Sequence, residues 1–176
     1  MRWRPGQVVG LGAVIGVIIL VAFFSWYFGW WPVACTTRGC VTAKAWAEQQ
    51  ELARKFAAFA GQEEPHPNDT LTTLLRQHLV RKAPGFSASS IGDAKRYREE
   101  VLQLTNEDLV GKATGVDIDV YDEKVLLPLL EQEGLRQQTQ VESLDELFVQ
   151  LSGQRRIWVL LNDARWDPQT ARLVRK

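Results

Sequence analysis

A long uncharged run near the N-terminus is the feature that most constrains what this chain can fold into. No charged side chain occurs between Pro5 and Thr37, and Val8 to Trp31 is almost wholly apolar. A helix over residues 8–31, rising about 1.5 Å per residue, would cover the roughly 30 Å hydrocarbon core of a bilayer. The run therefore predicts a transmembrane helix, which ends in tryptophans typical of a membrane interface and at Pro32.

The flanking charges predict the orientation of this helix. Arg2 and Arg4 precede it, so we expect residues 1–7 in the cytoplasm and a single-pass protein of the cell membrane, its C-terminal domain extracytoplasmic. A cleaved signal peptide is the alternative, but the run is longer than a usual signal core and ends in tryptophans.

Gly12 and Gly16 form a GxxxG pair, which is a candidate transmembrane dimer face. Glycine is common nearby, however, and the spacing leaves the oligomeric state open.

Both cysteines lie just beyond this run, in the sequence WWPVACTTRGC, within a predicted linker over residues 32–41. Their C-x4-C spacing differs from the C-x-x-C of redox motifs, and no second pair completes a zinc site. Outside the cytoplasm such a pair can oxidise, so the spacing favours a local Cys35–Cys40 disulfide, which would stabilise the fold by only about 2 kcal/mol. Lipidation of Cys35 stays open as the alternative, because PVAC faintly resembles a lipoprotein cleavage site.

The rest of the chain predicts one mainly α domain. Apolar residues recur at helical spacing, and helices are expected over residues 42–60, 68–82, 93–104, 105–113, 119–140 and 143–151, within a helical domain over 42–152. Pro128 lies inside the fifth of these and should kink it, because proline removes a helical hydrogen bond. The remaining residues, 153–176, are β-branched and aromatic around a turn at 167–170, which predicts a C-terminal β-hairpin.

No catalytic, cofactor-binding or metal-binding residue is predicted. His66 and His78 have no neighbour at metal-ligand spacing, and the serines of GFSASS lack the glycine of a nucleophile elbow. Residues 32–176 carry about two more acidic than basic side chains, since the whole chain has 21 of each and two arginines precede the apolar run. With no basic stripe, nucleic acid is not an expected partner.

The helical segment resembles a known family. A run of short helices behind an apolar anchor, with the proline-containing helix VLLPLLEQEGLR, looks like the N-terminal module of the SurA and PrsA extracytoplasmic chaperones and parvulin-type prolyl isomerases. The resemblance covers roughly residues 42–152 and implies a membrane-anchored, chaperone-like module that binds unfolded or extended polypeptides. The parvulin domain and the opening V-N-G-x-x-I sequence of the family are not found, so isomerase activity is not implied and no enzyme is predicted.

Three aromatic residues form a candidate client or partner surface. Trp158 and Trp166 fall on the predicted hairpin and Phe148 on the last helix, although helical aromatics more often pack in the core. A structural or scaffolding subunit of a cell-envelope complex is the alternative function. It would use the GxxxG pair and add the terminal hairpin to a partner's sheet. The expected partners are therefore the lipid bilayer and either extended polypeptides or envelope proteins.

Overall fold

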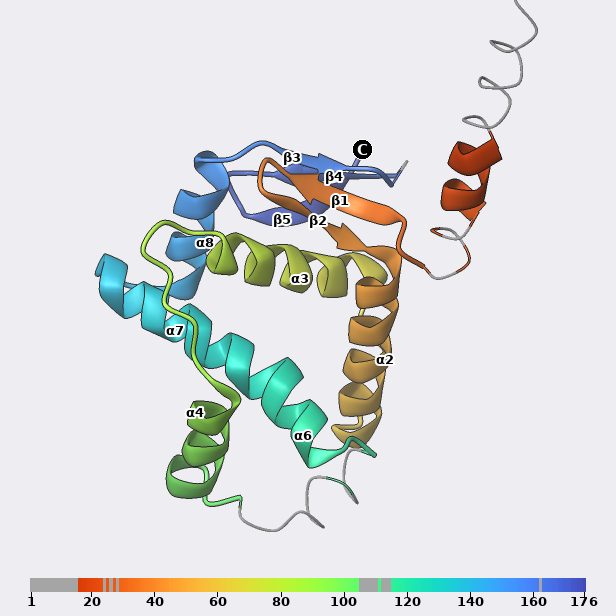
Figure 1. Ribbon diagram of the computed structural model, residues 1–176. Helices are drawn as coiled ribbons and strands as arrows, with labels where there is room; N and C mark the ends of the chain where they lie inside the picture. Colours follow the sequence, from red (N-terminus) through yellow and green to blue (C-terminus); the bar gives the residue numbers. More distant parts are fainter. Residues whose placement is uncertain are drawn as a thin grey trace, which may run out of the picture.

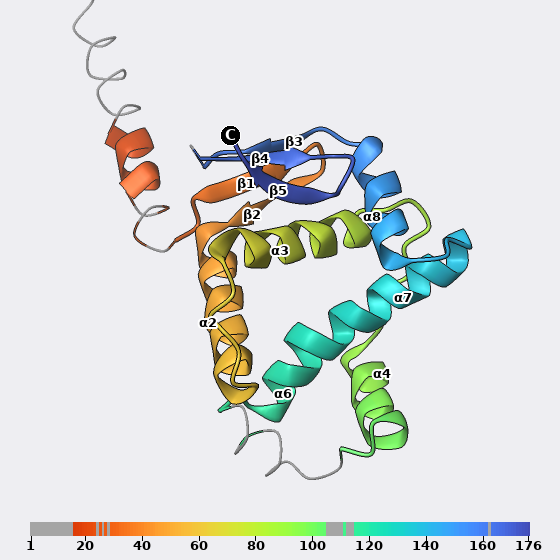
Figure 2. The same ribbon diagram turned by 180° about the vertical axis from the view of Figure 1, so that it is seen from behind.

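The protein combines a small β layer with helices that pack beneath and beside it (Figure 1). The computed structural model describes residues 16–23, 25, 27, 29–104, 111, 115–161 and 163–176. Helix α3 (Pro67–Arg81) runs under the strands, α2 (Ala43–Phe59) descends from one end of it, and α8 (Leu144–Gly153) stands at the other. From behind, α2, α3 and α7 (Leu127–Thr139) form three sides of a triangle (Figure 2).

The two helices that carry much of the core begin at side-chain caps. Thr42 accepts a hydrogen bond from the backbone N–H of Ala45 and so starts α2. Helix α3 begins at Pro67, one residue earlier than expected, because the ring Nδ1 of His66 accepts from the N–H of Asn68 and Pro67 occupies the first helical turn. Both predicted helices are confirmed, with the second shifted toward its N-terminus.

The remaining helices follow the predicted pattern with two irregular turns. Helix α4 (Ile91–Arg96) starts at a capping box between Ser90 and Asp93 and continues into a π-helical turn, η1 (Tyr97–Val101). Helix α6 (Ile118–Tyr121) continues through a second π-helical turn, η2 (Asp122–Leu126), into α7. Residues 105–110 and 112–114, most of one predicted helix, lie outside the described part of the chain.

The second π-helical turn lies directly before Pro128. A proline at this position cannot donate to the carbonyl of Lys124, so the regular bonding pattern must change nearby. The structure makes that change as a wide turn over Asp122–Leu126, and Pro128 itself is buried in the first turn of α7. The kink predicted at Pro128 is therefore present in the structure as a π-helical turn directly before the proline.

The segment treated as a cysteine linker in the sequence is a β-hairpin. Strands β1 (Pro32–Thr36) and β2 (Gly39–Thr42) pair antiparallel, and β1 also pairs with β3 (Ile157–Val159), which gives the order β2-β1-β3. Ala34 lies opposite both Val41 and Val159, and the sheet buries it completely. The N-terminal hairpin is thereby tied to the C-terminal part of the chain.

The C-terminal hairpin has the predicted turn. Strands β4 (Ala164–Asp167) and β5 (Arg172–Arg175) pair antiparallel, and Asp167 accepts hydrogen bonds from the Gln169 N–H and the Thr170 hydroxyl inside the turn. Strand β5 lies against α3, where the N–H of Leu173 donates to the Thr72 hydroxyl at 3.1 Å. This hairpin is confirmed, but it is a separate two-stranded sheet rather than the whole β structure.

The core has two main clusters, and both include α3. One cluster joins Leu71 and Leu75 to the inner face of β1 and β2, while the other joins Leu79 and Val80 to α7 and α8. Ile157 and Trp166 pack against both. Helix α3 is therefore the central element of the fold.

The predicted transmembrane span is wrong for the part of the chain that the structure describes. No helix there is both long and apolar enough to cross a membrane. Residues 16–23, 25 and 27 are helical, and the chain turns at Gly29, which has a φ of 66°. The predicted fold class, with its membrane helix, and the single-pass cell-membrane localisation are corrected accordingly. Residues 1–15, 24, 26 and 28 lie outside the described residues.

Candidate functional site

A groove between three helical segments of the described chain is the candidate binding site. Helices α2 and α3 form two walls, and the segment from Gly115 to Pro128, which includes α6 and η2, forms the third. The cavity has a volume of about 940 Å³, which lies within the range of known ligand pockets. A second cavity of about 490 Å³ adjoins it, because the two share wall residues such as Leu52 and Pro128.

The groove has an apolar floor and a charged rim. Leu52, Leu74 and Val116 supply aliphatic surface, and Val120 lies on the third wall with 40% of its surface exposed. The rim carries four carboxylates and three cationic side chains: Glu48, Glu51, Asp117, Glu123, Lys55, Arg81 and Lys124. Since both signs alternate around an apolar floor, the groove offers hydrophobic burial with little preference for the net charge of a ligand.

Rim charges are largely engaged with neighbouring side chains. Lys124 lies 3.1 Å from Glu123, and Arg81 donates from Nε to the buried carboxylate of Glu131 at 2.8 Å. The described lining contains no serine, cysteine or histidine. It combines aliphatic contact surface with charged side chains of both signs.

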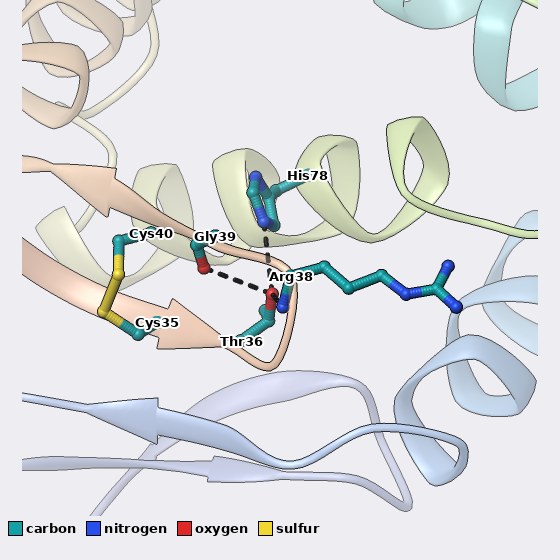
Figure 3. Close-up of a disulfide and its surroundings, with 6 residues drawn as sticks. All are labelled: Cys35, Thr36, Arg38, Gly39, Cys40 and His78. Carbon is teal, nitrogen blue, oxygen red and sulfur yellow. Dashed lines mark hydrogen bonds between the residues drawn. A yellow bond between two sulfur atoms is a disulfide. The ribbon is translucent and has the colours of Figure 1, made fainter.

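The disulfide predicted from the cysteine spacing is confirmed. Cys35 on β1 and Cys40 on β2 are directly opposite one another in the strand register and are bonded, with Cα atoms 4.0 Å apart. Figure 3 shows the bond crossing between the two strands near the hairpin tip. Trp158 of β3 lies opposite Cys35 on the other side, so these three residues form one row across the sheet. Trp158 is 48% exposed, which places this row on the outer face.

The other two aromatic residues of the predicted surface lie elsewhere. Phe148 belongs to the core and is only 3% exposed, with the Arg76 guanidinium stacked 4.5 Å above its ring. Trp166 is half-buried against both core clusters, and its indole N–H donates to the Ser152 hydroxyl. Trp158, Trp166 and Phe148 therefore do not form one surface, and of the three only Trp158 is mainly exposed.

The tip of the disulfide hairpin is docked on the C-terminal half of α3. The Thr36 hydroxyl lies 3.2 Å from Nε2 of His78, and it also donates to the Gly39 carbonyl (Figure 3). A Cβ at Gly39 would approach the His78 ring to 3.0 Å, and Gly39 has a φ of 144°, so glycine is required here on both counts. The hairpin, the bonded cysteines and α3 thus form one unit.

His78 should make the stability of this unit depend on pH. Burial lowers the pKa of His78, and the nearby charges of Lys82, Arg155 and Arg81 lower it further. Below an ordinary histidine pKa of about 6.5 the unfolded chain binds the proton more readily than the folded protein, so stability falls as the pH drops through this value. We expect His78→Gln to lose less stability between pH 7.5 and 5.5 than the parent protein does, as measured by urea unfolding.

The parent protein, measured in the same buffers and over the same pH range, is the control for this experiment. Parallel stability curves for His78→Gln and the parent protein would show that His78 does not cause the loss.

Gly16 is the residue of the predicted glycine pair that belongs to the described chain. Gly12 lies outside the described residues, and a Cβ placed at Gly16 would have no atom within 4 Å.

Comparisons of this chain with protein-family models, curated proteins and solved structures found no match.

Sequence reasoning missed the groove because its walls come from three separate segments. The apolar residues of α2 and α3 recur at helical spacing and predict helices, but this spacing alone does not distinguish a face in the core from the floor of a groove. Val116 and Val120 follow no helical stripe of their own, since α6 is only one turn long. The exposed aliphatic residue at position 120, beside four acidic residues, is the only local signal.

Proposed function

We propose that this chain is a chaperone-like, protein-binding module that takes extended or unfolded polypeptide segments into the groove between α2, α3 and the 115–128 segment. The observation that carries the proposal is the groove itself, a cavity of about 940 Å³ with an aliphatic floor. Such a surface binds apolar side chains through burial, at about 25 cal/mol per Å², with little sequence preference. Isomerase activity is not part of the proposal.

The arrangement of the first strands supports the resemblance to the SurA and PrsA module. The family's module opens with a strand, and this chain has a strand pair, β1 and β2, immediately before the first long helix of the domain. The V-N-G-x-x-I pattern of the family is not found in these strands, which the Cys35–Cys40 disulfide joins. The support consists of the order of a strand pair and a long helix, and the binding function remains a proposal.

A charged residue at the groove wall should test the function directly. Val120→Glu places a carboxylate beside the apolar floor, whereas Ile91→Glu changes an exposed aliphatic residue on α4, 55% exposed and outside the groove lining. We expect the full chain to suppress aggregation of a denatured client at stoichiometric amounts. Val120→Glu should lower this suppression by about fivefold or more, which corresponds to about 1 kcal/mol of lost burial per client contact.

Ile91→Glu should act like the parent protein, and circular dichroism should show that both variants fold. Absence of both aggregation suppression and peptide binding in the parent protein would refute the proposed function. Equal losses in the two variants would show instead that the groove is not the binding surface.

A further inference from the structure

Two arginines from distant parts of the chain converge on one carbonyl oxygen at the end of α3. Arg38, at the tip of the disulfide hairpin, donates from Nη1 to the Lys82 carbonyl at 2.7 Å. Arg155, in the connection between α8 and β3, donates to the same oxygen from Nη2 and to the Leu79 carbonyl from Nη1. Figure 3 shows the Arg38 side chain extended away from the hairpin tip, alongside α3.

No carboxylate of the described residues neutralises this pair. The ion pairs found in the described chain do not include Arg38, Lys82 or Arg155, and the neighbouring Arg81 is already paired with Glu131. The C-terminal end of α3 supplies about half a negative charge through its dipole. This partial charge is smaller than the summed positive charge of Arg38, Lys82 and Arg155, so most of that positive charge is uncompensated.

The titration behaviour of neighbouring groups agrees with a positive local field. Burial lowers the pKa of Arg155, and the charge of Arg38 lowers it further. Lys82, Arg155 and Arg81 all act to lower the pKa of His78, and no acidic group is among the causes. An anion at this position would therefore relieve repulsion between cations that the fold already holds together.

We propose that Arg38 and Arg155 form a binding site for an oxyanion, either the carboxylate of a polypeptide or free phosphate. Each guanidinium uses only one or two of its five N–H groups on the α3 carbonyls, which leaves further N–H donors on both arginines for an anion. Planar guanidinium groups bind carboxylate and phosphate oxygens in pairs, and such charged hydrogen bonds are about twice as strong as neutral ones. The site is independent of the groove and of the function proposed for it.

The experiment is a titration of the full chain with sodium phosphate at constant ionic strength, followed by NMR of the arginine Nε–H signals. The signals of Arg38 and Arg155 should shift in a saturable way. Arg155→Gln and Arg38→Gln should each weaken the apparent affinity at least about fivefold, because each removes a charged hydrogen-bond donor. Arg156→Gln is the matched control: it removes the same charge one residue away and should change the affinity by less than about twofold.

A second titration distinguishes the sources of the anion. In this titration a short peptide with one aspartate is compared with the same peptide carrying asparagine. Binding that requires both the aspartate and Arg155 assigns the site to polypeptide carboxylates. A response to phosphate alone assigns the site to the free anion. Arg38→Gln keeps the test valid if Arg155→Gln fails to fold, since Arg38 is exposed at the hairpin tip. Unsaturable shifts with both probes, or equal effects of Arg156→Gln and Arg155→Gln, would overturn the site.

Discussion

Asp122→Ala should lower the free energy of unfolding by about 3–5 kcal/mol, because it removes the buried counter-charge of the Arg98 guanidinium. Arg98 would keep only a longer contact, 3.4 Å, to the largely solvent-facing carboxylate of Glu99. The carboxylate of Asp122 accepts from Nε of Arg98 at 2.9 and 3.2 Å, and the two side chains are only 3% and 5% exposed. Arg98 also donates to the Leu104 carbonyl at 2.6 Å, a bond that cannot replace the lost negative charge. Urea unfolding followed by circular dichroism measures the difference.

The location of this pair explains why its loss should matter for the whole helical part. Arg98 lies in η1 and Asp122 in η2, so the pair connects the α4–η1 arm to the α6–η2–α7 segment. A small cluster of Ala94, Leu126 and Leu127 packs beside it. The apolar contact here is limited, and the buried ion pair therefore fixes how the arm is oriented on α7.

A surface pair gives the matched control. Glu133 and Arg136, one turn apart on α7, are paired at 2.6 Å but are 39% and 28% exposed. Glu133→Gln should cost less than about 1 kcal/mol, the usual value for a pair in contact with water. If Asp122→Ala costs no more than Glu133→Gln, the buried pair does not hold the arm.

Local signals in the sequence are sufficient to predict the helices, the disulfide and the C-terminal turn. The leucine stripe of α3, the C-x4-C spacing and the Asp167 turn each depend on residues close together in the chain, and each is present in the structure. The long apolar run predicts a membrane span, whereas no described helix is both long and apolar enough to cross a membrane. Gly29 turns the backbone before β1, a feature that the apolar composition of the run does not predict.

Features that join distant segments could not be predicted in the same way. The pairing of Cys35 with Trp158, the contact of Arg38 with the end of α3 and the Arg98–Asp122 pair depend on tertiary packing. Strand β1, which begins at a proline, and the four-residue strand β2 also carry weak strand signals, which is why the sequence predicts a linker over residues 32–41. The groove and the proposed oxyanion site both belong to this class, so neither was visible in the sequence.

Leu75→Ala is the second substitution with a large expected effect, about 2–5 kcal/mol, because the leucine is completely buried between α3 and the sheet. Leu74→Ala, one residue earlier, is the matched control. Leu74 is half-buried and lines the groove, so its truncation opens no closed cavity and should cost less than half as much. Denaturant unfolding of the two variants tests the assignment, and equal losses would show that the core does not close over α3 at Leu75.

The same experiment also tests whether α3 couples the two core clusters. Leu75 belongs to the sheet cluster and Leu79 to the cluster with α7 and α8, yet both lie on one helix and are fully buried. A domain whose clusters share a central helix should unfold in one cooperative step. Tryptophan fluorescence, to which Trp158 and Trp166 of the β layer and Trp46 of α2 contribute, should therefore give the same midpoint as circular dichroism in Leu75→Ala and Leu79→Ala. Separate midpoints would mean that the domain does not unfold in one step.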